Sequence, residues 1–183
     1  MKNTAEMSTI ISDINPYSMR LSHNWVLYSH LPHDTNWTLS SYKRVHTIST
    51  VGDAIAITDK EIIPETESIV QNSMMFLMKE EVAPMWEDKY NKNGGSFAYV
   101  VNTKDIYDVW TDAIYSIVGN TISENEAFVN GVNGITISKK KDFHIFKIWM
   151  KDCSIQNPSH VTACIKGLSA KGCLFYKHGE KKK

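Results

Sequence analysis

Short segments with the composition of β-strands make up much of this chain, and most of them follow one another along the sequence with no long helical pattern between them. Most of them are rich in β-branched and aromatic residues, and several are bounded by Pro, Gly or Asn. These segments are residues 25–31, 44–50, 72–82, 96–102, 131–141, 143–150 and 172–178. Because neighbouring strands joined by short turns pair antiparallel, we expect a mostly antiparallel sheet.

Helical patterns are fewer and separate the groups of strands. Residues 105–119 place apolar side chains at helical spacing and end at a glycine. A short helix is expected at residues 51–57. Asn157 followed by Pro158 favours the start of another helix, which runs to about Ile165. This pattern predicts the α+β class, with the helices on one face of the sheet.

A length of 183 residues suits one globular domain. Residues 1–19 are polar and mixed and are expected to form a flexible arm, and residues 179–183 form a basic tail. The domain itself is expected at residues 20–178. A domain of this size buries enough surface to be stable without a disulfide or a metal.

The charge balance and the cysteine content limit the kinds of ligand and site that this chain is expected to have. Lys+Arg 20 equals Asp+Glu 20, whereas proteins that bind many phosphates usually carry a basic excess. A ligand with one base and a few phosphates fits this balance. Widely spaced cysteines favour small buried thiols in a reducing compartment over a metal or redox site. They are Cys153, Cys164 and Cys173.

No segment has the pattern of a signal peptide or a membrane span, so we expect a cytoplasmic protein without membrane contact. Common enzyme motifs are also missing: the sequence has no phosphate-binding glycine loop, no HExxH and no G-x-S-x-G. The seven histidines are scattered without metal-ligand spacing. We therefore expect neither catalysis nor a metal or cofactor.

Two of the five tryptophans lie outside the strand and helix patterns. Trp37 lies in the polar loop 32–41, and Trp86 directly precedes Glu87. Trp offers a plane on which a base can stack, and an adjacent carboxylate accepts hydrogen bonds from the base edge. Alternatively, a loop Trp folds back as a lid on the core. Core positions are expected for Trp25, Trp110 and Trp149.

A lysine run occupies the tip of the hairpin formed by residues 131–150. Such a run is often only a solvated turn. Beside a base-binding cleft, lysines bind phosphate as flexible point charges. The candidates are Lys139, Lys140 and Lys141, with Lys147 and tail residues 181–183 as helpers.

The run PMWEDKYNKNGG at residues 84–95 closely resembles the central motif of the cap-binding translation initiation factor 4E family. The resemblance covers about residues 21–178, and its pieces occur in the family's order and spacing. The other matching pieces are HNWVLY (23–28), NWT (36–38), TVGD (50–53), VW…IVG (109–119) and GITISKKKDFHIFKIW (134–149). The chain is similar to a divergent member, of a kind expected from a virus or a protist.

The resemblance implies a cupped antiparallel sheet with about three helices on its convex face. It also implies that Trp37 and Trp86 sandwich the 7-methylguanine of an mRNA cap. Glu87 would accept hydrogen bonds from the base, and Trp149 would lie against the methyl group. Methylation gives the base a positive charge, which adds a cation–π attraction to the stacking and strengthens the bonds to Glu87.

The resemblance is weaker around the phosphates. The family's phosphate-binding arginine aligns best with Lys140, but its following lysines fall on Asp142 and Ile145. The C-terminal loop that usually covers the phosphates is also shorter here. The side chains that remain for the phosphates are Lys139, Lys140, Lys141 and Lys147.

The family's opposite face binds a helix with a YxxxxLΦ motif from a scaffold of the initiation factor 4G type. Here Ile55 replaces the tryptophan of that face, and Met19-Arg20-Leu21 replaces its HPL segment. We therefore expect either that scaffold or a divergent equivalent as partner. The corresponding residues of this chain are Val51, Ile55, Thr111, Asp112 and Tyr115.

Three functions follow from the resemblance. The first is an initiation factor that binds capped mRNA and a scaffold. The second is a protein that sequesters the cap without recruiting the usual scaffold, which the altered partner face would allow. The third, an enzyme acting on the cap, would need metal-binding carboxylates near the phosphates, and the lysine-rich tip has none.

Overall fold

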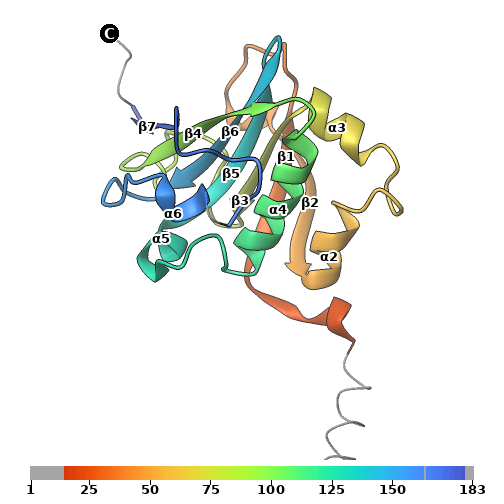
Figure 1. Ribbon diagram of the computed structural model, residues 1–183. Helices are drawn as coiled ribbons and strands as arrows, with labels where there is room; N and C mark the ends of the chain where they lie inside the picture. Colours follow the sequence, from red (N-terminus) through yellow and green to blue (C-terminus); the bar gives the residue numbers. More distant parts are fainter. Residues whose placement is uncertain (1–14, 163, 180–183) are drawn as a thin grey trace, which may run out of the picture.

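The computed structural model describes residues 15–162 and 164–179. Its centre is one curved antiparallel sheet with the strand order β2-β1-β3-β5-β6-β4-β7 (Figure 1). The strands are β1 (Arg20–His30), β2 (Lys43–Thr50), β3 (Met74–Lys79), β4 (Gly95–Asn102), β5 (Val132–Lys139), β6 (Phe143–Met150) and β7 (Leu174–Lys177). The expected α+β class and antiparallel sheet are therefore confirmed.

Alternation along the strands divides the side chains between two faces of the sheet. One row of directly paired, apolar residues crosses six strands on the face that the helices cover. Most of this row is fully buried, because it forms the centre of the main core. In spatial order the row is Leu27, Leu77, Ile135, Ile148, Phe97 and Phe175.

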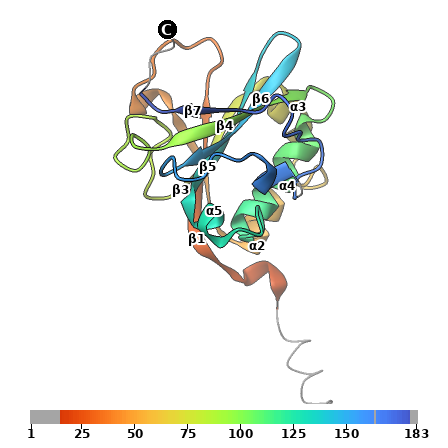
Figure 2. The same cartoon turned by 60° about the vertical axis from the view of Figure 1, so that its left-hand side comes forward.

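The helices lie together on this one face (Figure 2). The longest, α4, buries Val109, Trp110 and Ile114 against the sheet. Shorter helices each contribute apolar residues to the same core. The α-helices are α2 (Val51–Ala56), α3 (Thr66–Asn72), α4 (Ile106–Val118), α5 (Glu126–Gly131) and α6 (Ser159–Thr162), with 3-10 turns η1 (Pro16–Ser18) and η2 (Leu39–Ser41).

Two of these helices, α3 and α5, are absent from the sequence-based prediction. Both are too short for a clear helical period, with seven and six residues, and α5 depends on the Asn125 side chain, which accepts a hydrogen bond from the Phe128 N–H. Several predicted elements are also shorter than expected. The strand predicted at 72–82 ends at Lys79, and the helix predicted to reach Ile165 has its described turn at Ser159–Thr162.

The start of the described chain packs against α2. The Val51 N–H donates to the Met19 carbonyl at 3.0 Å, and a Cβ at Gly52 would meet the Tyr17 carbonyl oxygen at 2.7 Å. Residues 1–14 of the expected arm and residues 180–183 of the tail lie outside the described residues. Within the described part, no helix is long and apolar enough to cross a membrane.

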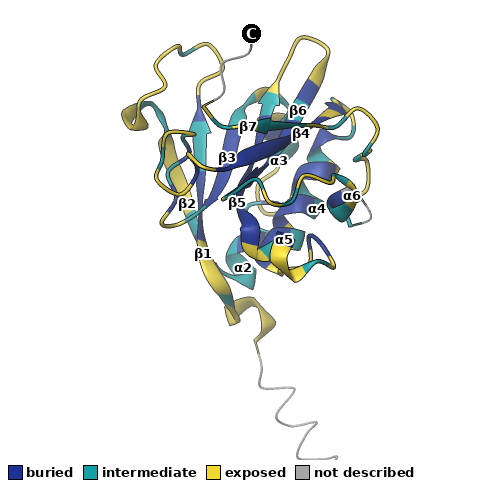
Figure 3. Cartoon of the chain, turned by 90° about the vertical axis from the view of Figure 1, so that its left-hand side faces the viewer, coloured by how far each residue is buried: buried dark blue, intermediate teal, exposed yellow. Residues whose placement is uncertain are grey.

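The face away from the helices, called the open face below, carries a second and smaller apolar cluster. Its buried members are Phe76, Met78, Val82 and Trp149, and Tyr28, Tyr42 and Met74 pack around them. Figure 3 shows the central strands β3, β4 and β5 largely buried and the loop after β1 largely exposed. None of the helices in the described part of the chain covers this cluster, which lies beside the loops that follow β1 and β3.

Candidate functional site

Trp37 lies in the loop between β1 and β2. Its ring stacks flat on the ring of His30, with centroids 4.3 Å apart and an interplanar angle of 1°. The residue is nevertheless 49% exposed. Trp37 is therefore held from one side while much of its surface remains open to solvent.

His30 holds this loop through both of its ring nitrogens. Nδ1 lies 2.9 Å from the Leu31 carbonyl oxygen, and Nε2 lies 2.9 Å from the Asn36 carbonyl oxygen and 3.1 Å from Ser41 Oγ. The Ser41 hydroxyl in turn donates to the Thr38 carbonyl at 2.8 Å. The buried imidazole thus fixes the backbone on both sides of Trp37.

Trp86 lies in the loop between β3 and β4 and is 48% exposed. The fully buried Asn91 shapes this loop by donating to the carbonyls of Ala83 at 3.0 Å and Met85 at 2.8 Å. The Asn133 amide of β5 donates to Asn91 Oδ1 at 2.9 Å. This network ties the loop that carries Trp86 to the sheet, so its indole is placed without being buried.

Tyr42 is the last residue of the loop that carries Trp37, directly before β2. Its ring meets Phe76 edge-on at 5.1 Å and lies 6.4 Å from the ring of Trp37. Burial, and to a smaller extent the charge of the nearby Glu87 carboxylate, raise the pKa of Tyr42 to about 12. This electrostatic interaction indicates that Glu87, which follows Trp86, lies near Tyr42. The Glu87 side chain is exposed.

Trp149 of β6 lies in the floor of the open face. It is buried, and its Nε1–H donates to Thr136 Oγ1 at 3.3 Å. The ring of His178 lies 4.8 Å from it. His178 Nε2 is 2.7 Å from Ser96 Oγ, and Nδ1 is 2.7 Å from the Asn91 carbonyl oxygen.

The surroundings of His178 link the C-terminal segment to the Trp86 loop. Burial lowers the pKa of His178, and the charge of Lys147 lowers it further, against the hydrogen bond to Asn91. The adjacent Gly179 packs on Trp86, since a Cβ there would lie 3.4 Å from the indole ring. Three residues of this site, His30, Tyr42 and His178, are missing from the sequence-based prediction, which had no motif to mark them.

The predicted phosphate-binding lysines lie in different surroundings. Lys147 belongs to the open face, two residues before Trp149 on β6. Lys140 and Lys141 are exposed at the tip of the β5–β6 hairpin. Lys139 donates to Asn72 Oδ1 at 2.7 Å, at the end of α3. Among the four, Lys147 is therefore the one beside the floor residue Trp149.

The predicted partner residues gather on the helical side, on α2 and α4. Tyr115 is partly exposed, and its hydroxyl is 2.6 Å from Thr58 Oγ1. The Thr58 carbonyl also accepts from the Tyr107 hydroxyl at 2.6 Å. Thr111 Oγ1 is buried without a hydrogen-bond partner. The remaining three are partly buried, namely Val51, Ile55 and Asp112.

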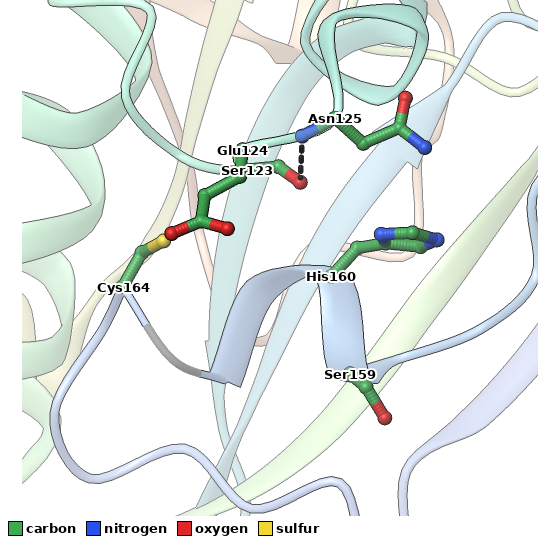
Figure 4. Close-up of a pocket in the computed structure, with 6 residues that line it drawn as sticks. All are labelled: Ser123, Glu124, Asn125, Ser159, His160 and Cys164. Atoms are coloured by element: carbon green, nitrogen blue, oxygen red, sulfur yellow. Dashed lines mark hydrogen bonds between the residues drawn. The ribbon is translucent and has the colours of Figure 1, made fainter.

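A surface cavity of about 350 Å³ lies on the helical side, between α5 and α6 (Figure 4). Its polar side chains already serve local structure: Ser123 Oγ accepts from the Asn125 N–H at 3.1 Å, and Asn125 caps α5. The other lining residues are Glu124, Ser159, His160 and Cys164. Across residues 15–162 and 164–179, no group of three His, Cys, Asp or Glu side chains is placed to hold a metal.

Comparison with known proteins agrees with this architecture. The family described as eukaryotic initiation factor 4E matches residues 20–180. The 4E homolog of Acanthamoeba polyphaga mimivirus is 28% identical over 155 residues, covering 75% of this chain and 57% of the relative. The initiation factor 4E of Candida albicans is 32% identical over 141 residues, covering 73% of this chain and 65% of the relative. The matched region thus spans under two thirds of either relative.

Solved structures show the same fold. C. elegans eIF4E-3, in complex with the 4E-binding protein Mextli and cap analog, is 26% identical with a TM-score of 0.62, over 74% of this chain and 76% of that chain. Schistosome eIF4E, complexed with m7GpppG and 4E-BP, is 18% identical with a TM-score of 0.63, over 75% of each chain.

Proposed function

The chain belongs to the eukaryotic initiation factor 4E family, and from this we propose that it binds the 7-methylguanosine cap of mRNA in cytoplasmic translation initiation. One observation carries the proposal. Two half-exposed tryptophans, Trp37 and Trp86, lie in loops that two buried polar side chains, His30 and Asn91, hold in place. The role is binding, without catalysis.

The base of the cap would insert between Trp37 and Trp86. Each stack is worth roughly 1–3 kcal/mol, and the positive charge of the methylated base adds a cation–π attraction. Glu87 would accept the hydrogen bonds donated by N1–H and the exocyclic amine, while the Trp86 backbone N–H meets the base carbonyl. Since an unmethylated guanine lacks the charge, it loses part of both interactions. The methyl group would point toward Trp149.

The phosphates would run along the open face from this base. Lys147 is the best-placed cation because it lies beside Trp149 on β6. Lys140 and Lys141 would meet charges farther along the RNA. Lys139 is engaged by Asn72 and contributes least. Lysines act here as flexible point charges and need no fixed geometry.

For the protein partner, we propose a scaffold helix of the initiation factor 4G type, or a divergent equivalent, on α2 and α4. C. elegans eIF4E-3 and schistosome eIF4E were solved with 4E-binding proteins. In this chain Ile55 offers a smaller apolar surface than a tryptophan, and Tyr115 adds an aromatic side chain on α4. This altered face also supports the second candidate, a protein that sequesters the cap without the usual scaffold.

Fluorescence titration with 7-methyl-GTP and GTP tests the cap proposal. We expect 7-methyl-GTP to bind much more tightly and to quench tryptophan emission. Trp37→Ala should weaken its binding by roughly 1–3 kcal/mol with the fold intact. Equal affinity for the two nucleotides would contradict the proposal. A variant that unfolds, with affinity following stability, would show instead that Trp37 is a lid on the core.

A further inference from the structure

The side chains of β6 that point to the open face change in character along the strand. Trp149 is buried and Lys147 and Ile145 are partly buried, while Phe143 is 37% exposed. Alternate residues of a strand share a face and lie about 6–7 Å apart. A ring, a cation and two apolar side chains therefore follow one another from the proposed base site to the hairpin tip.

The sheet register widens the apolar end of this row. Val100 of β4 pairs directly with Ile145 and is 62% exposed. Leu174 of β7 pairs with Ala98, diagonal to Val100, and is 55% exposed. Opposed and diagonal side chains of neighbouring strands lie within about 5–8 Å. The four side chains that form this surface, called the apolar shelf, are Phe143, Ile145, Val100 and Leu174.

A contiguous exposed apolar surface commonly marks a binding site, whereas isolated apolar side chains do not. Cations stand at both ends of this one. Lys147 separates the shelf from Trp149 on β6, and Lys140 and Lys141 are exposed where the hairpin turns beyond Phe143. The surface thus suits a ligand in which flat apolar groups alternate with negative charges, as bases and phosphates do in single-stranded RNA.

We propose that the apolar shelf binds the base of the first nucleotide that follows the cap. Lys147 then meets the bridging triphosphate, and Lys140 with Lys141 meets the next phosphate. This rests on the proposed function, because the cap base fixes where the RNA enters. A base lying flat on Val100 and Ile145 buries more apolar surface if it is a purine, so the shelf favours a purine over a pyrimidine.

Affinity measurements with cap dinucleotides test the shelf. Val100→Ser should weaken binding of m7GpppA about fourfold and leave binding of 7-methyl-GTP unchanged. It should also reduce the preference for m7GpppA over m7GpppC, which carry the same charge. Val45→Ser is the matched control, since Val45 is 55% exposed on the distant edge strand β2. That variant should change none of these affinities.

Methyl NMR gives a readout that does not depend on the variants. Ring currents from the added base should shift the methyl resonances of Val100, Ile145 and Leu174 with m7GpppA and not with 7-methyl-GTP. Absent shifts, together with an unchanged m7GpppA affinity in Val100→Ser, would overturn the shelf while 7-methyl-GTP still binds. Failure of 7-methyl-GTP to bind would instead refute the proposed function. Concentration-dependent self-association that Val100→Ser abolishes would assign the shelf to a second copy and overturn the RNA proposal.

Discussion

Replacing Glu87 with Gln removes a charge from the proposed base site with little other change. The side chain keeps its size, and Glu87 is exposed, so the free energy of unfolding should hardly change. A Gln amide retains one acceptor oxygen but turns an NH2 group toward a donor on the base edge. One of the two proposed hydrogen bonds is therefore lost, and the other loses its ionic character.

Hydrogen bonds to charged groups contribute about 1.5–3 kcal/mol each. Losing one and weakening the other should cost about 2–4 kcal/mol, which is roughly thirtyfold to a thousandfold in affinity for 7-methyl-GTP. The loss should be smaller for GTP, because its neutral base gains less from the carboxylate. Discrimination between the two nucleotides should therefore fall.

The structure supplies a second readout for this variant in the absence of nucleotide. Burial and the Glu87 charge together raise the pKa of Tyr42 to about 12. Without the carboxylate the phenolate is less disfavoured, so the pKa of Tyr42 should fall while burial keeps it above its ordinary value of 10.0. Tyrosine-resolved NMR titration measures this change.

Calorimetry with both nucleotides measures the affinities, and Glu81→Gln is the control because it removes an exposed carboxylate from the same loop. That control should leave both nucleotide affinities unchanged. If Glu87→Gln loses no affinity for 7-methyl-GTP while the pKa of Tyr42 still falls, Glu87 lies near Tyr42 but does not contact the base. That result would refute its assigned role.

Three further predictions concern other parts of the molecule. Lys147→Ser should weaken binding of 7-methyl-GTP more than binding of the bare nucleoside, and it should flatten the salt dependence of 7-methyl-GTP binding. Lys139→Ser should have a smaller effect. Equal losses of affinity in the two variants would contradict the larger role of Lys147 in phosphate binding. A generic YxxxxLΦ peptide should bind weakly in calorimetry and should bind more tightly to the Ile55→Trp variant, since an aromatic hot spot commonly contributes about 2 kcal/mol or more. Tight binding of the peptide to the unaltered chain would show that isoleucine at position 55 does not weaken this interaction. Because the pKa of His178 is lowered in the folded protein, the unfolded chain binds a proton at this residue at a higher pH than the folded protein does. The free energy of unfolding should therefore fall as pH drops below about 6.5, by at most about 1.4 kcal/mol per pH unit. His178→Asn should flatten this dependence in denaturant titrations, and an equally steep curve would place its origin elsewhere.

Much of the fold follows from local sequence patterns. Alternating β-branched and aromatic residues predict the strands, and helical spacing in residues 105–119 predicts α4, because both patterns reflect which side chains must face the core. The motif around Trp86 and Glu87 is equally local, so the sequence alone identifies it. The helices α3 and α5, with seven and six residues, show no clear helical period and escape such reasoning.

The site beyond that motif depends on contacts between distant segments. Nothing near His30 in the sequence indicates that its ring supports Trp37, and nothing near His178 indicates that it packs on Trp149; folding across the sheet makes both contacts. The lysines likewise differ in ways that only the tertiary structure decides. Lys139 and Lys147 are alike in the sequence, but the register of the sheet directs one to Asn72 beside α3 and places the other on the open face. The sequence thus determines the kind of side chains available, and the pairing of strands decides which of them can meet one ligand.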